Sequence, residues 1–167
     1  MTISMYQASV PVFTRALTNL SNVLKKGEAH AKDKGATPDG LLQQRLIFDM
    51  LPLVKQVQIA CDTAARGTAR MAGVEPKAFP DTETTLAQAH ARIDHTIEYL
   101  KTFKPAQLDG CETHKVVHKT RSGEVTYTGL DYLTQYALPN FFFHCTTAYD
   151  ILRVAGTPIG KRDYLGG

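Results

Sequence analysis

The sequence predicts an all-α fold, a four-helix bundle with a small β-hairpin inserted between its third and fourth helices. Two observations lead to this expectation. In four separate stretches, apolar residues recur at steps of three and four, which is the pattern of a bundle helix. Between the last two stretches, valine, threonine and tyrosine flank a Ser-Gly step, which is typical of a hairpin. The 167 residues suffice for one domain, and we expect residues 1–167 to form it.

The first two helices follow from their apolar faces. Residues 4–26 carry an apolar seam, and Ser4 with Gln7 forms a capping box at the start. The polar stretch 27–40 is predicted to be a loop. A long second helix is expected over residues 41–71, with a kink at Pro52. In this helix Asp49 and Gln56 lie one heptad apart, on the flank of the apolar face.

The third helix is predicted over residues 81–103, with Asp81 as its N-cap. The hairpin follows within residues 104–128, with its turn at Ser122-Gly123. The fourth helix spans residues 130–155 and is followed by a short tail that is expected to pack back onto the bundle. Pro139 removes one helix donor, which predicts a local distortion of the fourth helix.

The composition excludes several classes of function. The net charge of +3 is spread along the chain without a dense basic cluster, so we expect no nucleic-acid binding. No stretch approaches the roughly 18 apolar residues of a membrane span, and the start of the chain does not have the pattern of a signal peptide. Three widely spaced cysteines argue against a disulfide framework. We therefore expect a cytoplasmic protein without a membrane partner.

Two motif-like stretches are assigned ordinary structural roles. His114 and His118 have the i, i+4 spacing that chelates a metal on a helix, but the valines between them predict a strand, on which the two residues lie roughly 13 Å apart along the chain. Residues 156–162 resemble a phosphate-binding loop, but the loop is one residue too short and follows a helix. His90 is interpreted as a histidine at the edge of the core, paired with a neighbouring carboxylate or carbonyl group.

The strongest candidate site lies on the fourth helix. Asn140 and His144 occupy one stripe of an otherwise apolar face, so each needs a partner inside the bundle. Asp49 and Gln56 of the second helix are the expected partners. We therefore predict a pocket formed by Asp49, Gln56, Asn140 and His144, in which His144 is the candidate catalytic residue. A buried hydrogen bond between His144 and Asp49 is the alternative without a function.

Aromatic residues on the opposite side of the fourth helix point to self-association. Phe142 and Tyr149 lie away from the His144 stripe and would be exposed in a monomer. Exposed apolar surface of this kind is typical of an interface. We predict a homodimer.

Several motifs together resemble a known family. Residues 49–53, 56–58, 138–144 and 159–166 are similar to those of a bacterial family of unknown function within the DinB/YfiT-like superfamily of predicted metalloenzymes. The resemblance covers nearly the whole chain. It implies a four-helix bundle, commonly dimeric, that holds a divalent metal through three histidines. Some members of the superfamily resemble thiol-dependent transferases or hydrolases that act on small molecules.

The resemblance also implies specific site residues. His144 matches the second histidine of an H-x-x-x-H pair on the fourth helix, and Asn140 stands at the first position. The second-helix histidine is replaced near Asp49. The implied ligand set is therefore His144, Asp49 and Asn140 around one zinc, nickel or iron ion, and it retains one of the three histidines.

Three hypotheses follow for the function. In the first, the metal activates water or a thiol for attack on a small substrate, so the protein is a transferase or hydrolase with a degenerate metal site. In the second, the same residues form a metal-free pocket that binds a small molecule, with His144 as acid or base. In the third, the polar residues are a satisfied core network, and the protein acts through its dimer surface.

Overall fold

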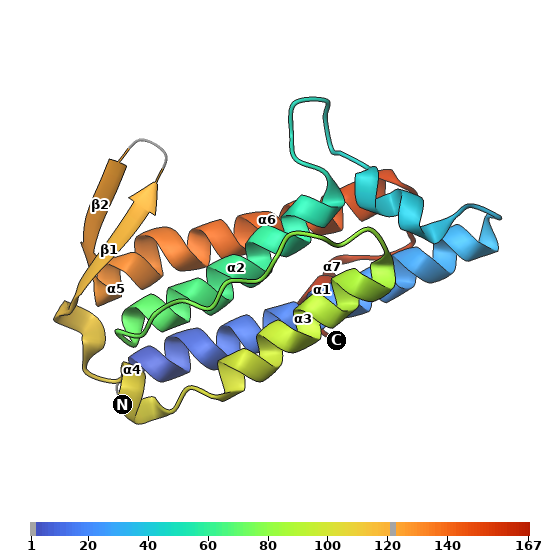
Figure 1. Ribbon diagram of the computed structural model, residues 1–167. Coiled ribbons are helices and arrows are strands. Elements are labelled where there is room, and N and C mark those ends of the chain that lie inside the picture. Colours follow the sequence, from blue (N-terminus) through green and yellow to red (C-terminus); the bar gives the residue numbers. More distant parts are fainter. Residues whose placement is uncertain (1–2, 121–122) are drawn as a thin grey trace.

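The computed structural model describes residues 3–120 and 123–167 and has the predicted four-helix bundle with an antiparallel hairpin (Figure 1). The fourth helix of the bundle is a continuous helical run in which a π-helical turn separates a short first segment from a long second one. The bundle helices are α1 (Met5–Asp33), α2 (Leu53–Met71), α3 (Leu86–Lys101) and the run of α5 (Gly129–Asp131), η3 (Tyr132–Ala137) and α6 (Leu138–Val154).

The shorter elements connect these helices. The two strands pair antiparallel, with Val116 opposite Tyr127. Ser122, which belongs to the predicted turn, lies outside the described residues. The connecting elements are η1 (Pro38–Gln43), α4 (Pro105–Leu108), η2 (Cys111–Thr113), β1 (Lys115–Thr120), β2 (Gly123–Thr128) and α7 (Lys161–Leu165). Among the described residues, no helix has the length and apolar character of a membrane span.

Helix α1 begins as predicted and ends later. The backbone amide of Gln7 donates a hydrogen bond to the Ser4 hydroxyl, and the backbone amide of Ser4 donates one to the side-chain oxygen of Gln7. The capping box is therefore confirmed. The helix continues past the predicted end to Asp33 because Gly27 is a packing position and not a helix end. A Cβ added there would lie 2.7 Å from Leu152 of α6, so the glycine permits close contact between the two helices.

The prediction that the second helix begins at Leu41 is wrong. Helix α2 begins at Leu53, directly after Pro52. A proline disfavours helical geometry in the residue before it and is well suited to a helix start, so it ends the preceding loop and does not kink a longer helix. The residues from 44 to 52 instead form a loop that projects from the bundle (Figure 1).

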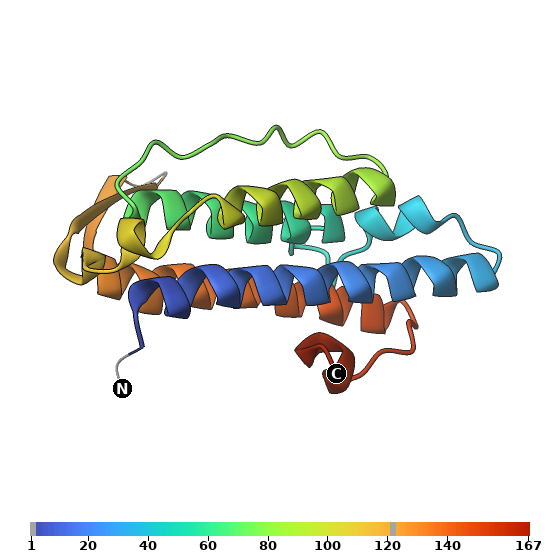
Figure 2. The same cartoon turned by 90° about the horizontal axis from the view of Figure 1, so that it is seen from below.

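The predicted start of the third helix is also wrong. Helix α3 begins at Leu86, capped by Thr85 and Gln88, and Asp81 lies before it in an extended segment. This segment, residues 72–85, runs back along α2 and α3 (Figure 2). It is held by Arg92, which is 3% exposed and contacts the carbonyl oxygen of Pro80 and the carboxylates of Asp81, Glu83 and Asp62.

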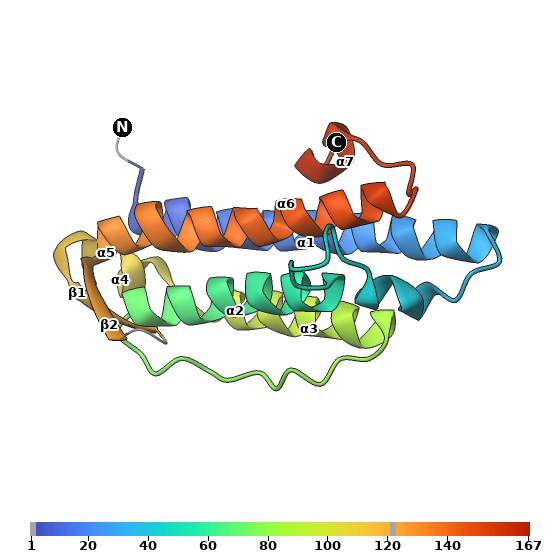
Figure 3. The same ribbon diagram turned by 90° about the horizontal axis from the view of Figure 1, so that it is seen from above.

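One apolar core lies between the bundle helices, and α2 packs most closely against α6. These two helices lie next to each other along their length (Figure 3). The π-helical turn η3 ends at Ala137, two residues before Pro139, the position at which the sequence predicted a distortion. Such wide turns are frequent at functional sites, and this one sets the course of the helix that carries Asn140 and His144.

The tail packs back onto the bundle, as predicted. Ile159 is buried, and the Tyr164 ring of α7 stands edge-on to the Tyr149 ring of α6, with 5.8 Å between the centroids. Tyr149 is therefore covered by its own chain, and Phe142 is half-buried. The expectation that these two rings are exposed in a monomer is wrong, because the sequence pattern does not show where α7 lies.

Candidate functional site

The candidate site is the seam between α2 and α6, where two polar pairs join the helices. His144 Nδ1 lies 2.7 Å from Gln56 Oε1, and both side chains are buried. One helical turn away, Asn140 Nδ2 donates to Thr63 Oγ1 at 2.8 Å. Of the predicted pocket residues, Gln56, Asn140 and His144 therefore gather on one seam. Both pairs satisfy groups that would be costly to bury alone.

The hydrogen bonds of Gln56 determine the tautomer of His144. The Gln56 amide nitrogen donates to the carbonyl oxygen of Leu51 at 2.8 Å, so Oε1 is the atom that faces His144. An amide oxygen only accepts, and therefore Nδ1 of the histidine must carry the proton. In the neutral ring, the lone pair is then on Nε2.

Nε2 of His144 is the free functional atom of the seam. It makes no hydrogen bond to a described residue, and it is not among the buried polar atoms that lack a partner, so part of its surface reaches solvent although His144 is only 8% exposed. Burial lowers the pKa of His144 below its ordinary value, because removal from water disfavours the charged ring. The seam therefore presents a neutral imidazole nitrogen that can accept a hydrogen bond or a proton at neutral pH.

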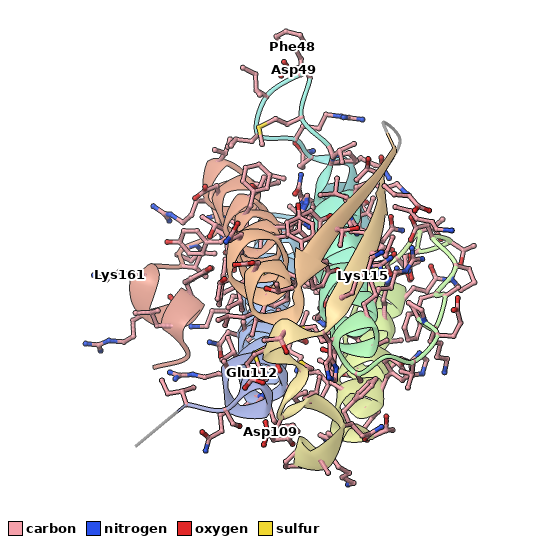
Figure 4. All side chains as sticks on the ribbon, turned by 90° about the vertical axis from the view of Figure 1, so that its left-hand side faces the viewer. Phe48, Asp49, Asp109, Glu112, Lys115 and Lys161 are labelled. Atoms are coloured by element: carbon pink, nitrogen blue, oxygen red, sulfur yellow. The ribbon has the colours of Figure 1, made fainter. Side chains whose placement is uncertain are left out.

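The prediction that Asp49 belongs to the site is wrong. Asp49 is exposed, and it lies at the tip of the loop from residue 44 to residue 52 (Figure 4). Because α2 begins only at Leu53, Asp49 is not on the helix that faces His144. The predicted hydrogen bond from His144 to Asp49 is replaced by the bond to Gln56.

Thr63 is the site residue that the sequence reasoning missed. It follows Gln56 by seven residues, so both side chains lie on one face of α2. That spacing was the available signal. The hydroxyl group of a threonine in a helix usually donates a hydrogen bond to a backbone carbonyl of the same helix. The sequence therefore does not suggest Thr63 as the partner of an amide on another helix.

The residues present do not fit the three-ligand metal centre that the resemblance implies. The seam offers one free imidazole nitrogen, and the other side chains are two amides and a hydroxyl. Neutral amides are weak ligands for zinc, nickel or iron, which prefer imidazole, thiolate and carboxylate groups. Within residues 3–120 and 123–167, no group of three or more His, Cys, Asp or Glu side chains could hold a metal ion.

The other histidines do not complete such a centre. His118 lies on β1, and its ring is 4.2 Å from the Tyr136 ring, whereas His114 is exposed before the strand, so the strand prediction is confirmed. His90 Nδ1 lies 2.9 Å from the Ser21 hydroxyl, and Nε2 is 3.9 Å from a Glu28 carboxylate oxygen. The three cysteines are buried and unpaired.

We expect the protein to lose stability as the pH falls below about 6.5, the value for histidine in an unfolded chain. Burial lowers the pKa of His144, and burial together with Arg70 lowers the pKa of His118. Below 6.5 the unfolded chain therefore binds protons that the folded protein does not, and the equilibrium shifts towards unfolding. Denaturant unfolding measured across this range tests the expectation. A His144→Gln variant should show a weaker pH dependence, and greater stability on acidification would contradict the account.

The comparisons with known proteins agree with this architecture. A crystal structure of a DinB family member protein from Shewanella denitrificans is similar to this chain, with 40% sequence identity and a TM-score of 0.91. The match covers 97% of this chain and 92% of that one. No curated protein matches the chain. The family described as "Domain of unknown function (DUF1993)" matches residues 5–165. Because the match spans almost the whole sequence, the chain belongs to this DUF1993 family, and its fold is that of a DinB-like helical bundle.

Proposed function

We propose that the protein binds a small molecule at the seam between α2 and α6 without a metal, and that His144 Nε2 accepts a hydrogen from this ligand. The single observation that supports the proposal is the chain of bonds from Leu51 through Gln56 to His144. This chain holds the proton on Nδ1 and leaves an unpaired, neutral acceptor on Nε2. The ligand must therefore present an O–H, N–H or S–H group.

Two residues that contact the His144–Gln56 pair favour a ligand with an apolar part. Phe143 is 55% exposed, and its ring is perpendicular to the His144 ring at a centroid distance of 5.2 Å. Leu51 is 45% exposed, and its carbonyl group orients Gln56. A polar acceptor beside exposed apolar groups is the usual composition of a small-molecule site, in which apolar surface supplies affinity and the polar atom fixes orientation.

The same geometry supports general-base chemistry. A neutral imidazole with a pKa below its usual value can take a proton from a bound hydroxyl or thiol group. The Gln56 oxygen remains on Nδ1–H throughout, so the ring keeps its orientation while Nε2 is protonated. Gln56 is thus a positioning residue, and His144 is the candidate base.

A matched pair of probes tests the proposal. Phenol carries a hydroxyl donor, and anisole is the same ring with the donor methylated. We expect phenol to shift the Nε2 resonance of His144 in a nitrogen NMR titration and to bind about tenfold more tightly than anisole, because the hydrogen bond forms only with phenol. In His144→Gln, the preference for phenol should disappear. Equal binding of the two probes, or a preference that survives the substitution, would contradict the proposal.

Metal analysis tests the metal-free part separately. Protein purified without chelator or affinity tag is expected to hold well under one equivalent of zinc, nickel or iron, because the seam offers a single good ligand. The content should be the same in His144→Ala. One equivalent of metal that is lost in this variant would show that the proposal is wrong and would favour the metal-dependent transferase or hydrolase.

A further inference from the structure

A second pocket, separate from the His144 seam, lies between α1, α6 and α7. Its volume is about 250 Å³. Helix α7 lies against α1 and α6, on the side of the bundle away from α2 and α3 (Figures 2 and 3). His144, in contrast, faces Gln56 of α2. The pocket therefore uses a different flank of α6, and a ligand bound there would not occupy the site of the proposed function.

The inner wall of this pocket is apolar. Helix α6 contributes Phe142 and Cys145, which lie three residues apart and so share a face. Helix α1 contributes four aliphatic side chains at steps of three and four, namely Val12, Ala16, Leu20 and Val23. An apolar cavity of about 150 Å³ accommodates benzene, so this pocket has room for a phenyl ring and a short chain attached to it.

Cys145 contributes apolar surface to the pocket and not a nucleophile. It is 3% exposed, and burial raises the pKa of its thiol well above the ordinary value. The thiolate is the reactive form of cysteine, and at neutral pH this side chain stays protonated. The lining therefore has the chemistry of a binding site and not that of a covalent one.

The rim of the pocket carries a cation. Among the described residues of the lining, Arg15 alone is charged, and it is exposed. Its Nη2 donates to the Leu165 carbonyl oxygen at 3.0 Å, and no described carboxylate forms an ion pair with it. Beside it, Asn19 Nδ2 donates to the Tyr164 carbonyl oxygen at 3.1 Å. Two backbone bonds to α7 thus hold the polar rim in place, and the guanidinium keeps further N–H groups for a ligand.

We propose that this pocket binds a small organic monocarboxylate, with its apolar body against Phe142 and the α1 side chains and its carboxylate on Arg15. The planar fork of a guanidinium matches the two oxygens of a carboxylate. One cation balances one negative charge, which favours a monocarboxylate over a phosphate ester. An apolar wall with a few polar groups at its edge is also the usual composition of a small-molecule site.

Two matched probes test the proposal by NMR titration. 3-Phenylpropionate and 3-phenylpropan-1-ol share the ring and the chain, and they differ in the charge of the head group. We expect the carboxylate to bind with a dissociation constant of about 1 mM or lower. It should bind about threefold to fivefold more tightly than the alcohol, the effect of one solvent-exposed ion pair. Added salt should weaken this preference, because ions screen exposed charges.

Arginine variants identify the cation that the carboxylate contacts. Arg15→Met should remove the preference for the carboxylate and leave the affinity for the alcohol unchanged. Arg153→Met is the matched control, because Arg153 also donates to a backbone carbonyl, that of Thr157 at 2.8 Å, but does not line the pocket. It should change neither affinity. A preference that survives Arg15→Met, or one that is lost in Arg153→Met, would overturn the proposal.

Filling the pocket identifies where the probes bind. Ala16 is half-buried in the wall, so Ala16→Phe should abolish binding of both probes, and Ala16→Leu, a smaller change, should weaken it. Thermal unfolding confirms that each variant is folded. The alcohol also has the hydroxyl donor expected at the His144 seam, so both titrations are repeated in His144→Gln, where the preference for the carboxylate should persist. No binding to the wild type, binding that survives both Ala16 variants, or a preference lost in His144→Gln would show that the proposal is wrong.

Discussion

Arg92→Met is expected to lower the free energy of unfolding by about 3 kcal/mol, because it removes the buried partner that three carboxylates share. Arg92 is 3% exposed and lies within 3.1 Å of carboxylate oxygens of Asp62, Asp81 and Glu83. Methionine fills similar space but neutralises none of these groups. The extended segment 72–85 also loses its anchor, because the same guanidinium binds the Pro80 carbonyl group.

Arg66→Met is the matched control for this prediction. Arg66 also pairs with Asp62, at 3.1 Å, but its side chain is 37% exposed. A solvent-screened pair of this kind contributes less than about 1 kcal/mol. Urea unfolding of both variants gives the two values. If Arg92→Met cost no more than Arg66→Met, the cluster around Arg92 would not hold the segment.

Gly129→Ala is expected to destabilise the protein by about 3 kcal/mol or more, at the upper end of the cost of overpacking. A Cβ at Gly129 would lie 2.0 Å from the backbone carbonyl oxygen of Cys111, and backbone cannot move aside as a flexible side chain can. The contact joins η2 to the start of the fourth helix. The substitution should therefore also displace the hairpin from the bundle.

Gly40→Ala provides the control, because a Cβ at Gly40 meets nothing within 4 Å and its backbone does not require glycine. We expect no loss of stability there, and a gain of up to about 1 kcal/mol from reduced freedom of the unfolded chain. Thermal unfolding compares the two variants. A Gly129→Ala protein as stable as Gly40→Ala would show that the approach of Cys111 is not tight.

The sequence predicted the bundle because its long helices have regular apolar seams and clear caps. Ser4 and Gln7 cap α1 as expected, and the valine-rich stretch pairs as a hairpin. Helix ends that depend on tertiary contacts were predicted at the wrong residues. Gly27 continues α1 because it packs against Leu152, and Asp81 is no cap because it pairs with Arg92.

The candidate site was predicted in part for a similar reason. His144, Asn140 and Gln56 lie on true helical faces, so periodicity placed them correctly on one seam. Asp49 belongs to a loop whose apolar residues happen to recur at helical spacing. Periodicity alone does not distinguish such a loop from a helix. Pro52 was the signal that marks the boundary. The position of α7 depends on long-range packing, such as the contact between the rings of Tyr164 and Tyr149. No local sequence pattern predicts that position.

The protonation of His144 tests the central claim most directly. A long-range proton–nitrogen NMR spectrum of the histidine rings at neutral pH reports which ring nitrogen carries hydrogen. We expect a neutral His144 ring with the proton on Nδ1 and none on Nε2, and we expect Gln56→Leu to abolish this preference. A ring with the proton on Nε2, or a doubly protonated ring at neutral pH, would contradict the claim.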